Sequence, residues 1–125
     1  MKTDFLKKRA QTFYKVAKRL LEEGDLAIAA FNFEQAAQLY LKYFLFLKLK
    51  DFPKIHSLTK LLREVGKAYR KELQAKKITK ENIGIISDLE QAYLTSRYLP
   101  AEFYLSQVKD MNRFLEILID FLGKL

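Results

Sequence analysis

The stretch from Ala29 to Lys42, AAFNFEQAAQLYLK, decides the fold of this 125-residue chain. It lies within a longer predicted helix, from near Asp25 to about Leu49, that is apolar nearly all round. A helix without a broad polar face belongs at the buried centre of a bundle, or is covered further by a partner chain. Buried polar groups need hydrogen-bond partners, and the polar residues of this helix are Asn32, Glu34, Gln35, Gln38 and Lys42. We therefore expect an all-α fold in which some of these side chains face another helix, a ligand or water.

Hydrophobic spacing predicts four further helices around this central one. The first begins at Thr3 or Asp4 and ends before Gly24, a residue type that often follows a helix. Pro53 lies in the loop that follows the central helix and prevents its continuation. These signals predict a helical hairpin followed by a short loop.

The third helix is predicted from the N-cap Ser57 to about Ala75. The fourth is predicted from Thr79 or Lys80 to about Tyr98, and the fifth from Glu102 or Ser106 to Leu122. The residues predicted to face the core in these three helices are Leu58, Leu61, Leu62, Val65, Tyr69, Leu73, Ile83, Ile86, Leu89, Tyr93, Val108, Met111, Leu115, Leu118 and Leu122. Helices joined by short loops imply an antiparallel up-and-down bundle of about five helices. No linker divides residues 1–125, so a single domain is expected.

The composition excludes several kinds of site. The chain has no cysteine, which rules out disulfides, thiolate zinc sites and cysteine nucleophiles and suits a reducing cytoplasm. The N-terminal residues lack the uninterrupted apolar run of a signal peptide. The most apolar run, Leu39 to Leu49, contains Lys42 and Lys48 and is too short to span a bilayer. We expect a soluble, cytoplasmic protein that spans no membrane.

The formal net charge of +8 is unevenly distributed. Residues 54–80 contain nine basic and two acidic side chains, a net charge of +7, and most of the basic ones are expected on the third helix. This helix could follow a nucleic-acid backbone with little sequence specificity, through Lys60, Arg63, Lys67 and Arg70. It could instead dock an acidic protein, or simply be a solvated face that keeps the protein soluble.

The single histidine, His56, directly precedes the predicted N-cap Ser57. One histidine alone forms neither a metal site nor a Ser-His-Asp triad, and no Gly-rich phosphate loop is present. No metal or cofactor site is predicted. His56 is either a ligand-binding residue beside a helix N-terminus, where an anion is stabilised, or a polar residue that ties the loop to the central helix.

A second candidate site is the segment from Tyr93 to Pro100, YLTSRYLP. Arg97, flanked by Tyr93 and Tyr98 at the end of the fourth helix, could hold a phosphate while a tyrosine stacks on a base. The alternative is structural: Arg97 would pair with Glu90 or Glu34, and the two tyrosines would be amphipathic core residues.

Three segments in this order, Phe33–Lys42, His56–Leu58 and Tyr93–Tyr98, resemble the HEPN domain family over essentially the whole chain. The resemblance implies an up-and-down helical bundle that usually forms a homodimer. Family members are often encoded beside a minimal nucleotidyltransferase, and nucleotide or nucleic-acid binding is proposed for many of them.

The resemblance also implies a test for catalysis. A subset of the family are metal-independent ribonucleases with the motif Arg-x(4–6)-His. Counting from Arg97, the histidine would fall at Glu102, Phe103 or Tyr104, and none of these is histidine. Glu102 could act as a base, yet its charge would repel RNA phosphate. Catalysis is therefore not expected.

We accordingly expect a non-enzymatic, homodimeric HEPN-type module that binds a nucleotide, a minimal nucleotidyltransferase partner, or both. The expected ligand-binding residues are Arg97, Tyr98, His56, Tyr93 and Gln35. The alternatives are a toxin-like ribonuclease centred on Arg97, Glu102 and Tyr104, and a module whose basic helix docks a nucleic acid or an acidic protein.

Overall fold

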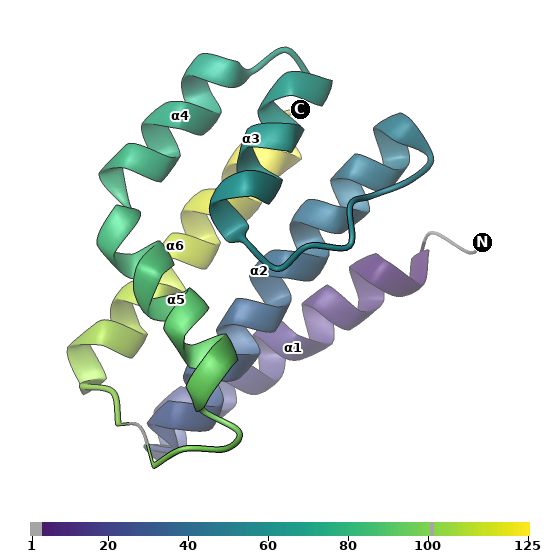
Figure 1. Ribbon diagram of the computed structural model, residues 1–125. Coiled ribbons are helices and arrows are strands. Elements are labelled where there is room, and N and C mark those ends of the chain that lie inside the picture. The colour runs from purple at the N-terminus through teal and green to yellow at the C-terminus, as the bar shows by residue number, and fades with distance from the viewer. Residues whose placement is uncertain (1–3, 101) are drawn as a thin grey trace.

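The computed structural model describes residues 4–100 and 102–125, and this part of the chain folds into six α-helices without strands (Figure 1). The helices are α1 (Asp4–Glu23), α2 (Leu26–Leu49), α3 (Leu58–Ala68), α4 (Glu72–Glu81), α5 (Ile83–Thr95) and α6 (Leu105–Gly123). The prediction of an all-α fold is confirmed, with six helices rather than five. The alternative N-cap Thr3 lies outside the described residues.

The longest helix, α2, is the centre of the molecule. It pairs along its length with α1 and also packs against α3, α5 and α6 (Figure 1). Its buried residues are Ala29, Ala30, Asn32, Phe33, Glu34, Ala36, Ala37, Gln38, Tyr40, Leu41 and Leu45. The central, buried position predicted for the segment AAFNFEQAAQLYLK is thus confirmed.

Capping interactions fix where α1 ends and where α3 begins. Gly24 adopts a left-handed φ of 83°, and Asp25 N–H donates to the carbonyl oxygen of Leu20 at 3.0 Å, which closes α1 as predicted. At the start of α3, the Ser57 hydroxyl accepts a hydrogen bond from Lys60 N–H at 3.2 Å, so the predicted N-cap is confirmed. The loop between α2 and α3 contains Pro53, as expected.

The additional helix arises because the predicted third helix is broken after Ala68. Arg70 has a left-handed φ of 56°, and Lys71 N–H donates to the carbonyl oxygen of Gly66 at 2.7 Å, which turns the chain back. The turn brings α4 against α3 so closely that a Cβ built on Gly66 would lie 2.8 Å from the Ala75 Cβ. The predicted helices over 57–75 and 79–98 were therefore wrong in their bounds.

This break changes which side chains reach the core. Leu73 and Ile83, both predicted core residues, are 81% and 57% exposed. The turn at residues 69–71 and the boundary between α4 and α5 at Asn82 change the direction of the chain, so a continuous helical stripe no longer exists. The predicted inward face of the last helix is confirmed, because Val108, Met111, Leu115, Leu118 and Leu122 are all buried.

The helix α4 lies at the edge of the molecule, away from α1 in the view of Figure 1. It packs chiefly against α3, with a smaller contact on α5, and Ala75 is its single buried residue. No helix in the described part of the chain is long and apolar enough to cross a membrane.

Candidate functional site

Five side chains that are distant in sequence form one cluster, which we call the Arg97 cluster: Phe31, His56, Tyr93, Arg97 and Tyr98. Phe31 comes from α2, His56 from the loop before α3, Tyr93 from α5, and the other two from the turn after α5. The guanidinium carbon of Arg97 lies 5.0 Å from the ring centroid of Phe31, 5.2 Å from that of Tyr93 and 4.9 Å from that of Tyr98. The cation is thus surrounded by aromatic rings that stabilise its charge.

Tyr93 joins the parts of this cluster. Its ring stacks on Phe31 at a centroid distance of 6.5 Å and on His56 at 4.7 Å. Its hydroxyl oxygen also lies 3.3 Å from His56 Nε2. One interpretation of the sequence is that His56 ties the loop to the central helix. The structure corrects this, because the contacts of the imidazole with Tyr93 tie the loop to α5 instead.

Arg97 retains its charge for other partners. Its Nη2 donates to the Tyr93 carbonyl oxygen at 3.2 Å, and no ion pair in the described residues joins it to Glu34 or Glu90. The alternative of a structural ion pair was therefore wrong. Tyr98 was considered as a core residue in that alternative, yet it is 75% exposed. The cluster thus presents an exposed cation beside an exposed aromatic ring.

The positive end of α3 is already occupied by a carboxylate. Leu58 N–H donates to Glu90 Oε2 at 2.9 Å, while Lys60 N–H is bound by Ser57. Glu90 therefore provides the negative charge that a helix N-terminus favours. The expectation that His56 lies where this helix end welcomes an anion is corrected by this contact. Within the cluster, Arg97 is an exposed cation without an ion pair among the described residues.

A buried carboxyl group lies on the neighbouring face of α2. Glu34 is fully buried and accepts hydrogen bonds from the side-chain amides of Gln35 and Gln38. Burial is the main cause that raises the pKa of Glu34 from 4.5 to about 7, and the charge of Glu90 raises it further. Burial likewise lowers the pKa of Lys42, against the opposing effect of Glu34. The predicted site residue Gln35 is thus hydrogen-bonded to this buried carboxyl group.

Two residues of the predicted ribonuclease centre lie on the surface. Glu102 and Tyr104 are both exposed, and no hydrogen bond or ion pair within the described residues joins either of them to Arg97. The Tyr104 backbone N–H instead donates to Gln107 Oε1 at 2.7 Å, at the start of α6. The described contacts therefore link Arg97 to His56 through Tyr93, not to Glu102.

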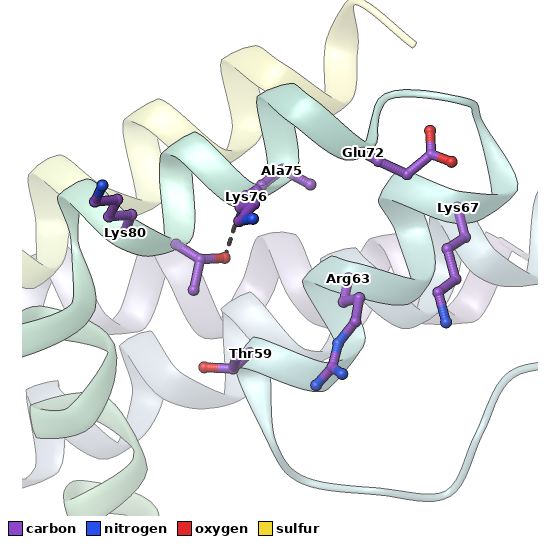
Figure 2. A pocket seen from close by; sticks show the side chains of 8 residues that line it. Thr59, Arg63, Lys67, Glu72, Ala75, Lys76 and Lys80 are labelled. Atoms are coloured by element: carbon purple, nitrogen blue, oxygen red, sulfur yellow. Dashed lines mark hydrogen bonds between the residues drawn. The ribbon is translucent and has the colours of Figure 1, made fainter.

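The predicted basic residues lie elsewhere, on α3 and the turn after it. Lys60, Arg63 and Lys67 are exposed on α3, and Arg70 is exposed in the turn to α4. Because the chain turns here, the basic block extends over two helices, not mostly one as expected. Between these helices lies a groove of about 560 Å³ (Figure 2), lined by Thr59, Arg63, Lys67, Glu72, Ala75, Lys76, Thr79 and Lys80.

Sequence reasoning missed Phe31 in the Arg97 cluster and the α4 lysines beside the groove. Phe31 is one of many aromatic residues in a helix that is apolar nearly all round, so its type and spacing carried no distinguishing signal. Sequence reasoning included Lys76 and Lys80 in the basic segment. It did not predict the turn at Arg70, which places these lysines beside α3. In the described part of the chain, no group of three or more His, Asp or Glu side chains could hold a metal ion.

A family model described as HEPN domain matches residues 3–125, nearly the whole chain. Neither the curated proteins nor the solved structures include a match to the chain.

Proposed function

Because the chain belongs to the HEPN domain family, we propose that it is a non-enzymatic module that binds a nucleotide at the Arg97 cluster. The observation that carries this proposal is the placement of Arg97. Its guanidinium lies over the rings of Phe31, Tyr93 and Tyr98 without an ion pair in the described residues. An arginine held in this way is oriented in advance and keeps its charge for a ligand.

The chemistry of a nucleotide fits this arrangement in two parts. A guanidinium is planar, remains charged at neutral pH and donates paired hydrogen bonds to phosphate oxygens. Tyr98, which is 75% exposed, offers a ring face on which a base can stack. His56 is exposed at the edge of the cluster and adds a ring nitrogen that can form a hydrogen bond. Glu90 bonds to Leu58 N–H at 2.9 Å, so the α3 N-terminus is not the expected phosphate position.

The experiment is a thermal unfolding series with ATP, AMP and adenosine as probes. We expect ATP and AMP to raise the melting temperature of the wild type and adenosine to do so less, because it lacks the phosphate. Arg97→Ala should remove the shift. Arg19→Ala, which removes an exposed arginine from α1, should retain it. The proposal fails if no nucleotide, including GTP, CTP and UTP, stabilises the wild type, or if the two variants respond alike.

One observation favours a second candidate, a metal-independent ribonuclease. Tyr93 contacts both Arg97 and His56, so a cation and an imidazole flank the same ring although the motif histidine is missing. In RNA cleavage without metal, an imidazole can accept the proton of the 2′-hydroxyl, whose oxygen attacks the phosphorus. The bond from phosphorus to the 5′-oxygen breaks, the 5′-oxygen takes a proton from water, and a guanidinium stabilises the charged phosphate. Incubation of RNA with the protein in EDTA decides this: cleavage that His56→Ala and Arg97→Ala both remove supports an enzyme, and intact RNA excludes this mechanism.

Pairing with a second chain is part of the proposal. Four further exposed apolar side chains lie near the end of α5 and the start of α6, at Leu94, Leu99, Tyr104 and Leu105. Apolar side chains exposed in such number support a protein interface, for which a second copy of the chain is our first candidate. A minimal nucleotidyltransferase, implied by the family resemblance, is the other partner to be tested.

A further inference from the structure

The groove between α3 and α4 has a character that the proposed nucleotide site does not explain. Its wall is mainly apolar, formed by Ala75, by the methyl groups of Thr59 and Thr79, and by the stems of long side chains. Figure 2 shows the charged ends of Arg63 and Lys67 pointing away from α4. The groove thus combines an apolar floor with a charged rim.

The charge of this rim is strongly positive. Arg63, Lys67, Lys76 and Lys80 contribute four cations from two helices, and Glu72 is the one acidic residue among those that line the groove. Lys67 Nζ also lies 3.8 Å from Glu64 Oε2, which makes a weak and exposed ion pair. No ion pair in the described residues engages Arg63, Lys76 or Lys80. The rim therefore offers several cations that are free to meet an acidic partner.

The helix α4 is also only weakly covered by its own chain. It buries one residue, Ala75, and packs chiefly against α3. On its other flank Leu73 is 81% exposed, in a second depression that three lysines and one acidic residue also line: Lys76, Lys77, Lys80 and Glu81. A helix with apolar surface on both flanks, each edged by lysines, has the pattern of a docking element. Its length on the order of 15 Å matches about three turns of a partner helix.

We propose that the α3–α4 groove binds an acidic amphipathic helix of a partner protein. The apolar face of such a helix would cover the groove floor while its carboxylates meet Arg63, Lys76 and Lys80. A nucleic acid fits this surface less well. A phosphate backbone would leave the apolar floor uncovered, and no aromatic ring lines the groove for base stacking.

The test uses a fluorescein-labelled synthetic peptide of about 14 residues, with leucines on one helical face and glutamates on the other, followed by fluorescence anisotropy. We expect saturable binding that weakens as NaCl rises from about 50 to about 300 mM. A peptide of the same composition in scrambled order should bind about tenfold more weakly, because it cannot place an apolar stripe in the groove.

Two variants and a control locate the site. Arg63→Glu/Lys80→Glu should weaken binding about tenfold or more, because it reverses charge on both sides of the groove. Thr59→Trp should weaken it while keeping the charge, because the indole fills the groove. Lys15→Glu/Arg19→Glu makes the same charge change on α1 and should have little effect. Circular dichroism melts confirm that each variant folds.

Three outcomes would overturn the proposal. The first is no binding of the amphipathic peptide, or equal binding of the scrambled one. The second is an equal loss in Lys15→Glu/Arg19→Glu, which would mean that net charge alone attracts the peptide. The third is tighter binding of a short oligouridylate that Arg63→Glu/Lys80→Glu removes, which would identify the groove as a nucleic-acid site. The nucleotide proposal is unaffected by all three, because these substitutions lie outside the Arg97 cluster.

Discussion

Replacing Glu34 by glutamine should make the protein more stable at neutral pH. Glu34 is fully buried in α2, with its carboxyl oxygens bound by the amides of Gln35 and Gln38. A glutamine keeps the size of the side chain and, with its neighbouring amides reoriented, can keep hydrogen bonds with both. It removes the ionisation of a buried carboxyl group, which is the unfavourable part of this arrangement.

The magnitude follows from the pKa. Burial raises the pKa of Glu34 from 4.5 to about 7. Between these values the folded protein holds a proton that the unfolded chain has lost. The free energy of unfolding therefore falls as the pH rises through this range and levels off above it. At about 1.4 kcal/mol per pH unit, ionised Glu34 destabilises the fold by about 3 kcal/mol at high pH.

The assay is urea unfolding, followed by circular dichroism at several pH values from about 4 to about 8. The stability of Glu34→Gln minus that of the wild type should be nearly constant below pH 4.5, rise up to about pH 7 and then stay high. Glu22→Gln, at an exposed position on α1, is the matched control and should show no such rise. A difference between Glu34→Gln and wild type that stays flat from pH 4.5 to pH 8 would refute the reasoning.

Three further predictions follow from the packing. Gly66→Ala should destabilise the protein by about 1–3 kcal/mol in urea unfolding, because its Cβ would lie 2.8 Å from the Ala75 Cβ. Gly84→Ala in α5 is the control and should be neutral or stabilising, because the space around Gly84 is open. Equal losses of stability in the two variants would contradict this account. Ser57→Ala should cost about 1 kcal/mol through loss of the Lys60 N–H bond, and no change in thermal stability would show that the cap contributes nothing. Analytical ultracentrifugation should show a dimer that Leu105→Asp weakens, whereas a single species near 14.7 kDa for the wild type would exclude homodimerisation.

The parts of the fold that sequence predicts best are those specified by local signals. The apolar segment around Phe33 predicted the buried central helix, Gly24 predicted the end of α1, and Ser57 predicted the start of α3. Each signal acts through the backbone or the burial of its own segment, so it needs no knowledge of the remaining chain.

The turn between α3 and α4 had no such signal. An arginine, Arg70, occupies the left-handed position that glycine usually fills, so the sequence contains no signal for a helix end there. What favours the turn is the close contact of Gly66 with Ala75, which exists only after the chain has turned back. The sequence therefore could not predict that Leu73 is exposed or that the α4 lysines lie beside α3.

The candidate site shows the same division. Arg97, Tyr93, Tyr98 and His56 were predicted as ligand-binding residues from their chemistry, and contacts through Tyr93 and Arg97 join all four in one cluster. Their contacts could not be predicted, because they depend on how α2, α5 and the loop before α3 meet. The sequence therefore left open an ion pair of Arg97 with an acidic residue, which the observed stacking replaces.

The central claim, that Arg97 binds the phosphate of a nucleotide, is tested most directly by NMR. The Nε–Hε cross-peak of Arg97 in ¹⁵N-labelled protein can be assigned by its loss in Arg97→Lys and followed as ATP is added. We predict a saturable shift of this peak, together with shifts at the rings of Tyr93 and Tyr98 and a weaker response to adenosine. An Arg97 peak that does not move with ATP or any other common nucleoside triphosphate, while the protein stays folded, would contradict the account.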